Sequence, residues 1–77
     1  MAKYREAIGD FDDYLARRPN SAKAFSYRAD CYSELGDTKQ ALADYQDAAR
    51  FYEQSGETGS DYDRVKRRIA KLSLKQA

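Results

Sequence analysis

The feature that most constrains this chain is an internal similarity at a spacing of 34 residues, as from Ala7 to Ala41. The segment Tyr4–Ala22 can be aligned with Thr38–Gly56 so that small, apolar and acidic residues coincide. The aligned pairs are Ala7 with Ala41, Ile8 with Leu42, Asp10 with Asp44, Phe11 with Tyr45, and Leu15 with Ala49. A similarity at such a fixed period indicates a repeated supersecondary unit that buries its apolar face against its neighbours.

A short interruption defines that unit. In the stretch YSELGDTKQALADY, apolar residues keep helical spacing on both sides of Leu35-Gly36-Asp37. Glycine is the usual residue at the left-handed end of a helix, and aspartate can cap the next helix through its carboxylate. Because so few residues separate the two apolar stripes, the helices must run antiparallel and side by side. The interruption therefore predicts the corner of a helical hairpin.

The whole chain has apolar stripes of helical period, and no segment has the alternation of a strand. The sequence predicts an all-α fold of four helices at about 3–17, 22–35, 38–54 and 61–74. Pro19 ends the first helix, since the residue before a proline is displaced from the helical region. The stretch QSGETGS has two glycines and no apolar residue, which predicts a loop.

Composition excludes several classes of function. The chain has 77 residues, a net charge of +1, one cysteine and no histidine. It is therefore one small domain without the commonest general base and metal ligand, and we expect no catalytic residue, cofactor or metal. No stretch is long and apolar enough for a membrane span, and a signal peptide is not evident. We expect a cytoplasmic protein, as the default for a chain in which neither segment is evident.

The complete unit AKAFSYRADCYSELGDTKQALADYQDAARFYEQS resembles a tetratricopeptide repeat. The matching residues are Phe25, Ala29, Tyr32, Gly36, Ala41, Tyr45 and Ala48, in the order and spacing of the family. The resemblance implies a single domain of stacked helical hairpins, with a half repeat at 1–21, a full repeat at 22–55, a loop at 56–60 and a capping helix at 61–77. Tyr14, Glu53 and Arg28 depart from the family pattern.

Arg28 stands where the family commonly has leucine, on the apolar stripe of the second helix. A buried charge without a partner is costly, and Asp10 and Asp44 occupy equivalent places on the two flanking helices. We expect Arg28 to pair with one or both, which would fix the register of the helices. The alternative is that Arg28 extends along the surface to solvent.

The resemblance implies a non-catalytic module that binds a protein or peptide in a concave groove lined by the first helices of its repeats. Tyr27 is the strongest contact candidate, because an exposed aromatic side chain is a common anchor. Ser26 and Asp30 stand where family members that grip a chaperone's terminal carboxylate have other residues, so the sequence does not support that activity. The candidate groove residues are Lys23, Ser26, Tyr27, Asp30, Ser33 and Glu34; the alternative is that most are simply solvated.

Three further interpretations stay open. About three repeats are usually needed for a stable stack, so the chain is expected to self-associate as a homo-oligomer through the edge formed by Tyr4, Ile8 and Phe11. An alternative is a truncated or engineered repeat scaffold without a native activity. A lesser alternative is binding of nucleic acid or another acidic surface by the last helix, where residues 61–77 carry six basic and two acidic side chains, a net +4. The order of those charges, acidic first and basic later, also suits the helix dipole and favours a solvated face.

Overall fold

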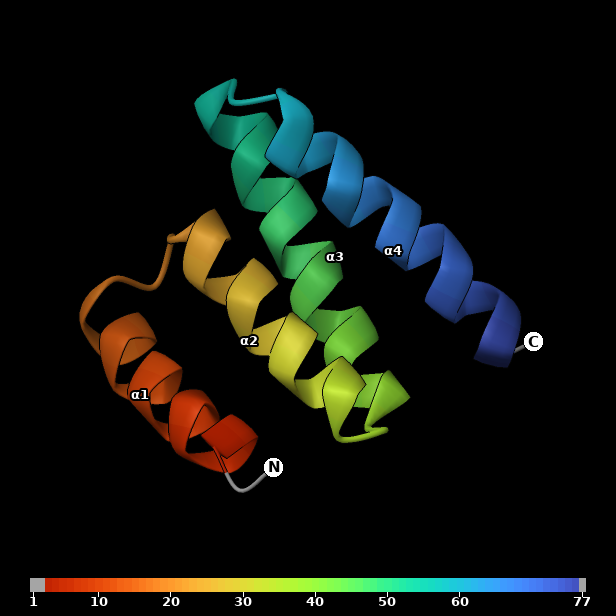
Figure 1. Cartoon of the computed structure of the whole chain (residues 1–77). Helices are drawn as coiled ribbons and strands as arrows, with labels where there is room; N and C mark the ends of the chain where they lie inside the picture. Colours follow the sequence, from red (N-terminus) through yellow and green to blue (C-terminus); the bar gives the residue numbers. More distant parts are fainter. Residues whose placement is uncertain (1–2, 77) are drawn as a thin grey trace.

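The computed structural model describes residues 3–76, and within them the chain forms four α-helices (Figure 1). These are α1 (Lys3–Arg17), α2 (Ala22–Glu34), α3 (Thr38–Ser55) and α4 (Ser60–Gln76). The predicted all-α architecture is confirmed, and every helix boundary falls within two residues of its expected place. The second helix ends one residue early because Leu35 forms its carboxyl-terminal cap.

Each helix packs on the next one along the chain, so that α2 and α3 lie in the centre with α1 and α4 on either side (Figure 1). The most extensive contact joins α2 to α3. The molecule measures 34 × 34 × 17 Å, which is the shape of a slab. Helices α2 and α3 each pack against a helix on two sides, whereas α1 packs mainly against α2.

The corner between α2 and α3 has the predicted hairpin geometry. Gly36 has a φ of +82°, in the left-handed region that glycine adopts without strain. The amide of Gly36 donates to the carbonyl of Ser33 (3.0 Å), and the amide of Asp37 donates to that of Tyr32 (2.9 Å). The Asp37 carboxylate accepts from the amide of Gln40 (3.3 Å) and caps α3. One glycine and one aspartate thus end one helix and begin the next.

The main hydrophobic cluster lies where α2, α3 and α4 meet. Ala29, Ala41 and Ala48 have no exposed surface, which lets the backbones of α2 and α3 approach closely. The larger side chains of Tyr45 and Val65 are also fully buried. The cluster consists of Ala22, Ala29, Ala41, Tyr45, Ala48, Ala49, Tyr52, Val65 and Leu72.

In residues 3–76 no helix is both long enough and apolar enough to cross a membrane.

Candidate partner-binding surface

Arg28 joins three helices through its guanidinium group. Its Nε donates to Oδ2 of Asp44 (2.7 Å) and its Nη2 donates to Oδ1 of the same carboxylate (2.8 Å), so the contact with α3 is bidentate. Its Nη1 donates to Oδ1 of Asp12 on α1 (2.7 Å). The hydrogen bond with Asp44 raises the pKa of Arg28 above its ordinary value, and burial partly opposes that rise. Arg28 is therefore a structural cation rather than a residue that extends to solvent.

Of the two expected partners Arg28 pairs with Asp44 alone, and its partner on α1 is Asp12 rather than Asp10. Side chains four apart lie on the same side of a helix, so Asp12 points toward α2 together with the buried Ile8. Asp10 lies two residues from Ile8, nearly on the opposite side of α1, and is exposed. Helices α1 and α3 present different faces to α2, and the repeat alignment alone could not show that.

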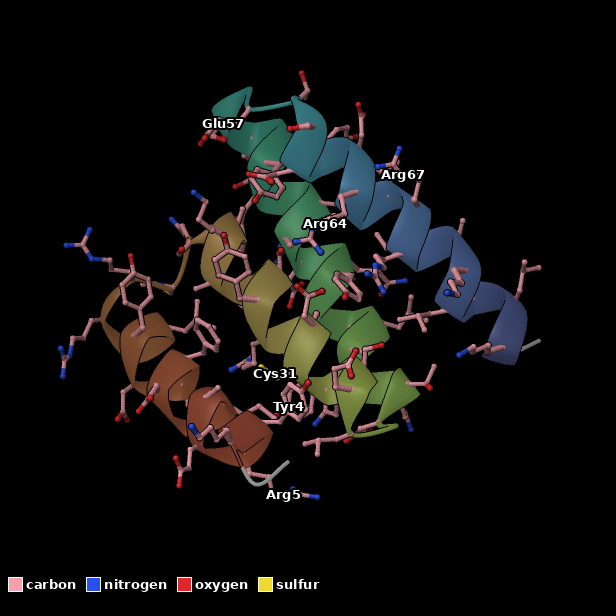
Figure 2. The ribbon with its side chains drawn as sticks, in the orientation of Figure 1. Tyr4, Arg5, Cys31, Glu57, Arg64 and Arg67 are labelled. Carbon is pink, nitrogen blue, oxygen red and sulfur yellow. The ribbon has the colours of Figure 1, made fainter. Side chains whose placement is uncertain are left out.

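A second arginine, Arg64 of α4, makes an equivalent connection to α2. Its Nη2 donates to the hydroxyl of Ser26 (2.8 Å), and its Nη1 lies 3.1 and 3.2 Å from the two carboxylate oxygens of Asp30. Asp30 also accepts from the buried hydroxyl of Tyr45. Burial is the main cause of the raised pKa of Tyr45, and this hydrogen bond to Asp30 raises it further. Figure 2 shows Arg64 extending from α4 toward the centre of the molecule.

Sequence reasoning did not identify Arg64 as a structural residue, although one signal was available. Arg64 directly precedes the buried Val65, just as Arg28 directly precedes the buried Ala29. An arginine next to the most buried position of a helix has the aliphatic part of its side chain on apolar surface. Its charge then lies between the core and the solvent, so it requires a partner.

The six candidate groove residues on α2 divide into two groups. Ser26 is buried (1% exposed) and Asp30 is half-buried, and Arg64 binds both. The predicted solvated face therefore does not include these two side chains. Ser33 is half-buried. Lys23, Tyr27 and Glu34 are exposed, and Tyr27 is the large side chain among them, with 43% of its surface accessible.

A hollow of about 370 Å³ opens between α1 and α2 beside Tyr27. The rings of Tyr27 and Phe11 have centroids 6.1 Å apart at an angle of 43°, and together they form an aromatic wall. Asp10 and Lys23, which are both exposed, add one charge of each sign to its lining. The hollow can therefore accept an apolar side chain and offers charged groups beside it. Its lining consists of Asp10, Phe11, Tyr14, Ser21, Lys23, Ala24 and Tyr27.

The predicted self-association edge is only partly a surface. Tyr4 is exposed and Phe11 is half-buried, but Ile8 is 8% exposed because it faces α2. Tyr14, which the sequence reasoning did not include, is more exposed than Tyr4. The prediction that Ile8 belongs to an exposed edge with Tyr4 and Phe11 is therefore wrong.

The comparisons with known proteins agree with this architecture. The family described as "Tetratricopeptide repeat" matches residues 11–43, from α1 through α2 into α3. The chain is 40% identical over 42 residues to "Hsp70-Hsp90 organizing protein 3" of Arabidopsis thaliana, which covers 54% of this chain and 8% of that protein. It is 30% identical over 71 residues to "Serine/threonine-protein phosphatase T" of Trypanosoma brucei brucei, covering 92% of this chain and 15% of that protein. No solved structure matches.

The chain carries a tetratricopeptide repeat, and its helical-hairpin stack is the fold of that family. Repeats of this family are non-catalytic modules that mediate protein–protein interaction. The chain spans less than a sixth of the length of these relatives, so their whole activities do not transfer to it. The division into a half repeat, a full repeat at 22–55 and a capping helix stays a prediction, since the matched segment begins inside α1.

Proposed function

We propose that this chain is a protein-interaction module that holds an apolar side chain of a partner protein or peptide in the hollow between α1 and α2. The observation that carries the proposal is the aromatic wall formed by Phe11 and the exposed Tyr27 around that hollow. An apolar recess with a few polar groups at its rim is the usual form of a binding pocket. A cytoplasmic location stays a prediction.

The surroundings of α2 support this position over the rest of the groove. Arg64 already uses the polar groups of Ser26 and Asp30, so a partner would have to break an ionic contact to reach them. The ring of Tyr27, by contrast, is held on one side by Phe11 and open on the other. An aromatic side chain in that position is suited to act as an anchor.

Selection from a random peptide library tests the proposal. The wild-type chain, immobilised at low density, should enrich peptides that share one large apolar residue. The Tyr27→Ala variant should bind those peptides at least about tenfold more weakly, because an aromatic anchor commonly contributes about 2 kcal/mol. Tyr4→Ala is the matched control, since Tyr4 has a similar exposure (37%) and lies outside the hollow.

Equal binding by the wild-type chain and by Tyr27→Ala would overturn the proposal, and so would a selection that enriches no common residue. Far-ultraviolet circular dichroism of both variants ensures that a loss of binding is not a loss of the helical fold.

A further inference from the structure

One side of α1, next to the hollow that α1 forms with α2, resembles a covered face of α3. Three residues of α1, Ala7, Asp10 and Tyr14, align by the 34-residue spacing with Ala41, Asp44 and Ala48. On α3 these positions are at most 5% exposed, because α2 packs over them. On α1 they are half-buried, exposed and 44% exposed, respectively, and within residues 3–76 no helix packs over them. The face thus has the pattern of a helix contact without the helix.

The partner that α3 has at this face defines what α1 could receive. Asp44 is paired with Arg28, which projects from the antiparallel helix α2. Asp10, at the equivalent position on α1, makes no ion pair within the described chain. A helix that reproduced the contact on α1 would therefore present an arginine to Asp10 and a small residue to Ala7.

Helix α4 has an exposed stripe with this chemistry. Asp63, Arg67, Ala70 and Leu74 follow one another at spacings of four, three and four, so they share one side of the helix. That side faces away from α3, since Val65 and Leu72 are the buried residues of α4. Leu74 is 78% exposed, and Arg67 has no ion pair within the described chain. Figure 2 shows Arg67 on the outer side of α4, away from α3.

We infer that α4 of one copy packs antiparallel on the uncovered face of α1 in a second copy, with Arg67 paired to Asp10 as Arg28 is paired to Asp44. In this register Ala70 lies opposite Ala7, and Asp63 approaches the basic end of α1 at Arg17. The inference rests on the proposed function in that the added helix would also cover the hollow between α1 and α2.

Charge complementarity supports this occupant. Glu6, Asp10 and Asp13 are all exposed and recur along one side of α1. Residues 60–76 carry six basic and two acidic side chains, a net +4, and of the basic ones only Arg64 is held in an ion pair in residues 3–76. Such opposed surfaces steer two copies into one orientation.

The contact joins different surfaces, so it is head-to-tail and does not close on itself as a two-fold dimer. Tyr14 stands where α3 has the small Ala48, and its bulk keeps the added helix farther from α1 than α2 is from α3. The assembly should therefore be weak and reversible, and should grow with protein concentration beyond a dimer.

Charge reversal tests the pairing by sedimentation velocity from about 10 µM to about 1 mM, the range in which weak interfaces are populated. Asp10→Arg alone and Arg67→Asp alone should each weaken association by about five- to tenfold, because each replaces an attraction by a repulsion. An equimolar mixture of the two variants should associate again, since the arginine introduced on α1 of one variant then meets the aspartate introduced on α4 of the other. Arg68→Asp is the matched control for the charge of α4.

A strict monomer at the highest concentration would overturn the inference. So would a mixture that associates no better than its components. If Arg67→Asp leaves association unchanged, the copies meet through α1 alone, and the head-to-tail arrangement is wrong. Peptide binding by the hollow at micromolar protein is measured separately, so failure of the self-association leaves the proposed function standing or falling on its own result.

Discussion

Helices α1 and α3 carry the same residue pattern 34 positions apart and yet occupy different environments. In α3 the pattern is buried, with Ala41, Tyr45 and Ala48 fully covered by α2 and α4. In α1 the equivalent positions are half-buried or exposed, because α1 packs mainly against α2. The difference shows that a repeat pattern specifies which face of a helix can be buried, while the neighbouring helices decide whether it is.

The sharpest way to break this comparison is to exchange the residues at one pair of equivalent positions. Ala48→Tyr should destabilise the fold by about 3 kcal/mol or more, because the site has no exposed surface and no space for a ring. Tyr14→Ala, the reverse exchange on α1, should change the free energy of unfolding by less than about 0.5 kcal/mol. Urea denaturation followed by circular dichroism measures both, and equal effects would contradict the difference in packing.

Arg28 binds two carboxylates that differ in burial, Asp44 on α3 and Asp12 on α1. Arg28→Ala should cost about 2–3 kcal/mol, because it leaves the carboxylate of Asp44 buried without its cation. Asp12→Asn should cost less than about 1 kcal/mol, since the Asp12 side chain is 52% exposed and water can replace the contact. Thermal unfolding of the two variants measures the difference. A stability of Arg28→Leu equal to or above that of wild type would show that the charge is not required.

The phenol of Tyr45 gives α3 a pH-dependent contribution to stability that α1 lacks, because α1 has Phe11 at the equivalent position. Burial and the bond to Asp30 raise the pKa of Tyr45, so the folded chain keeps this proton at a pH where the unfolded chain loses it. Its contribution is fully present below about pH 10 and declines as the pH rises, by up to about 1.4 kcal/mol per pH unit.

We therefore expect Tyr45→Phe to flatten the loss of stability between about pH 10 and pH 11.5, measured by urea denaturation at each pH. Part of the slope should remain, since Tyr32 and Tyr52 also have a raised pKa, mainly through burial. An unchanged alkaline slope in the variant would mean that Tyr45 does not contribute to it.

The smallest expected effect concerns the helix backbone itself. Gly9 lies inside α1 where α3 has Ala43, and a β-carbon added at Gly9 would meet no atom within 4 Å. Gly9→Ala should stabilise the chain by about 0.5–1 kcal/mol, because alanine loses less backbone entropy in a helix. Gly36→Ala should instead destabilise it, since Gly36 has a φ of +82°. Thermal melting of both variants gives the two signs, and a destabilised Gly9→Ala would contradict this account.

Much of the fold could be predicted from the sequence because its signals are local. The corner at Gly36 follows from one glycine and one aspartate, and the helix limits follow from Pro19 and the glycine-containing loop. The candidate site was predicted less well. Tyr27 could be identified as an exposed aromatic residue, but the burial of Ser26 depends on Arg64, which is 38 residues away in the chain.

The sequence by itself determined the number of helices, their limits, their repeat family and the need of Arg28 for a carboxylate. These properties depend on helical period, capping residues and the cost of a buried charge, which act over a few neighbouring residues. Only the tertiary structure decided that Asp12 rather than Asp10 meets Arg28 and that Arg64 binds Ser26 on α2. It also decided that a hollow remains beside Tyr27. The rotation of each helix about its own axis is set by packing against its neighbours, and the rotation determines which side chains meet.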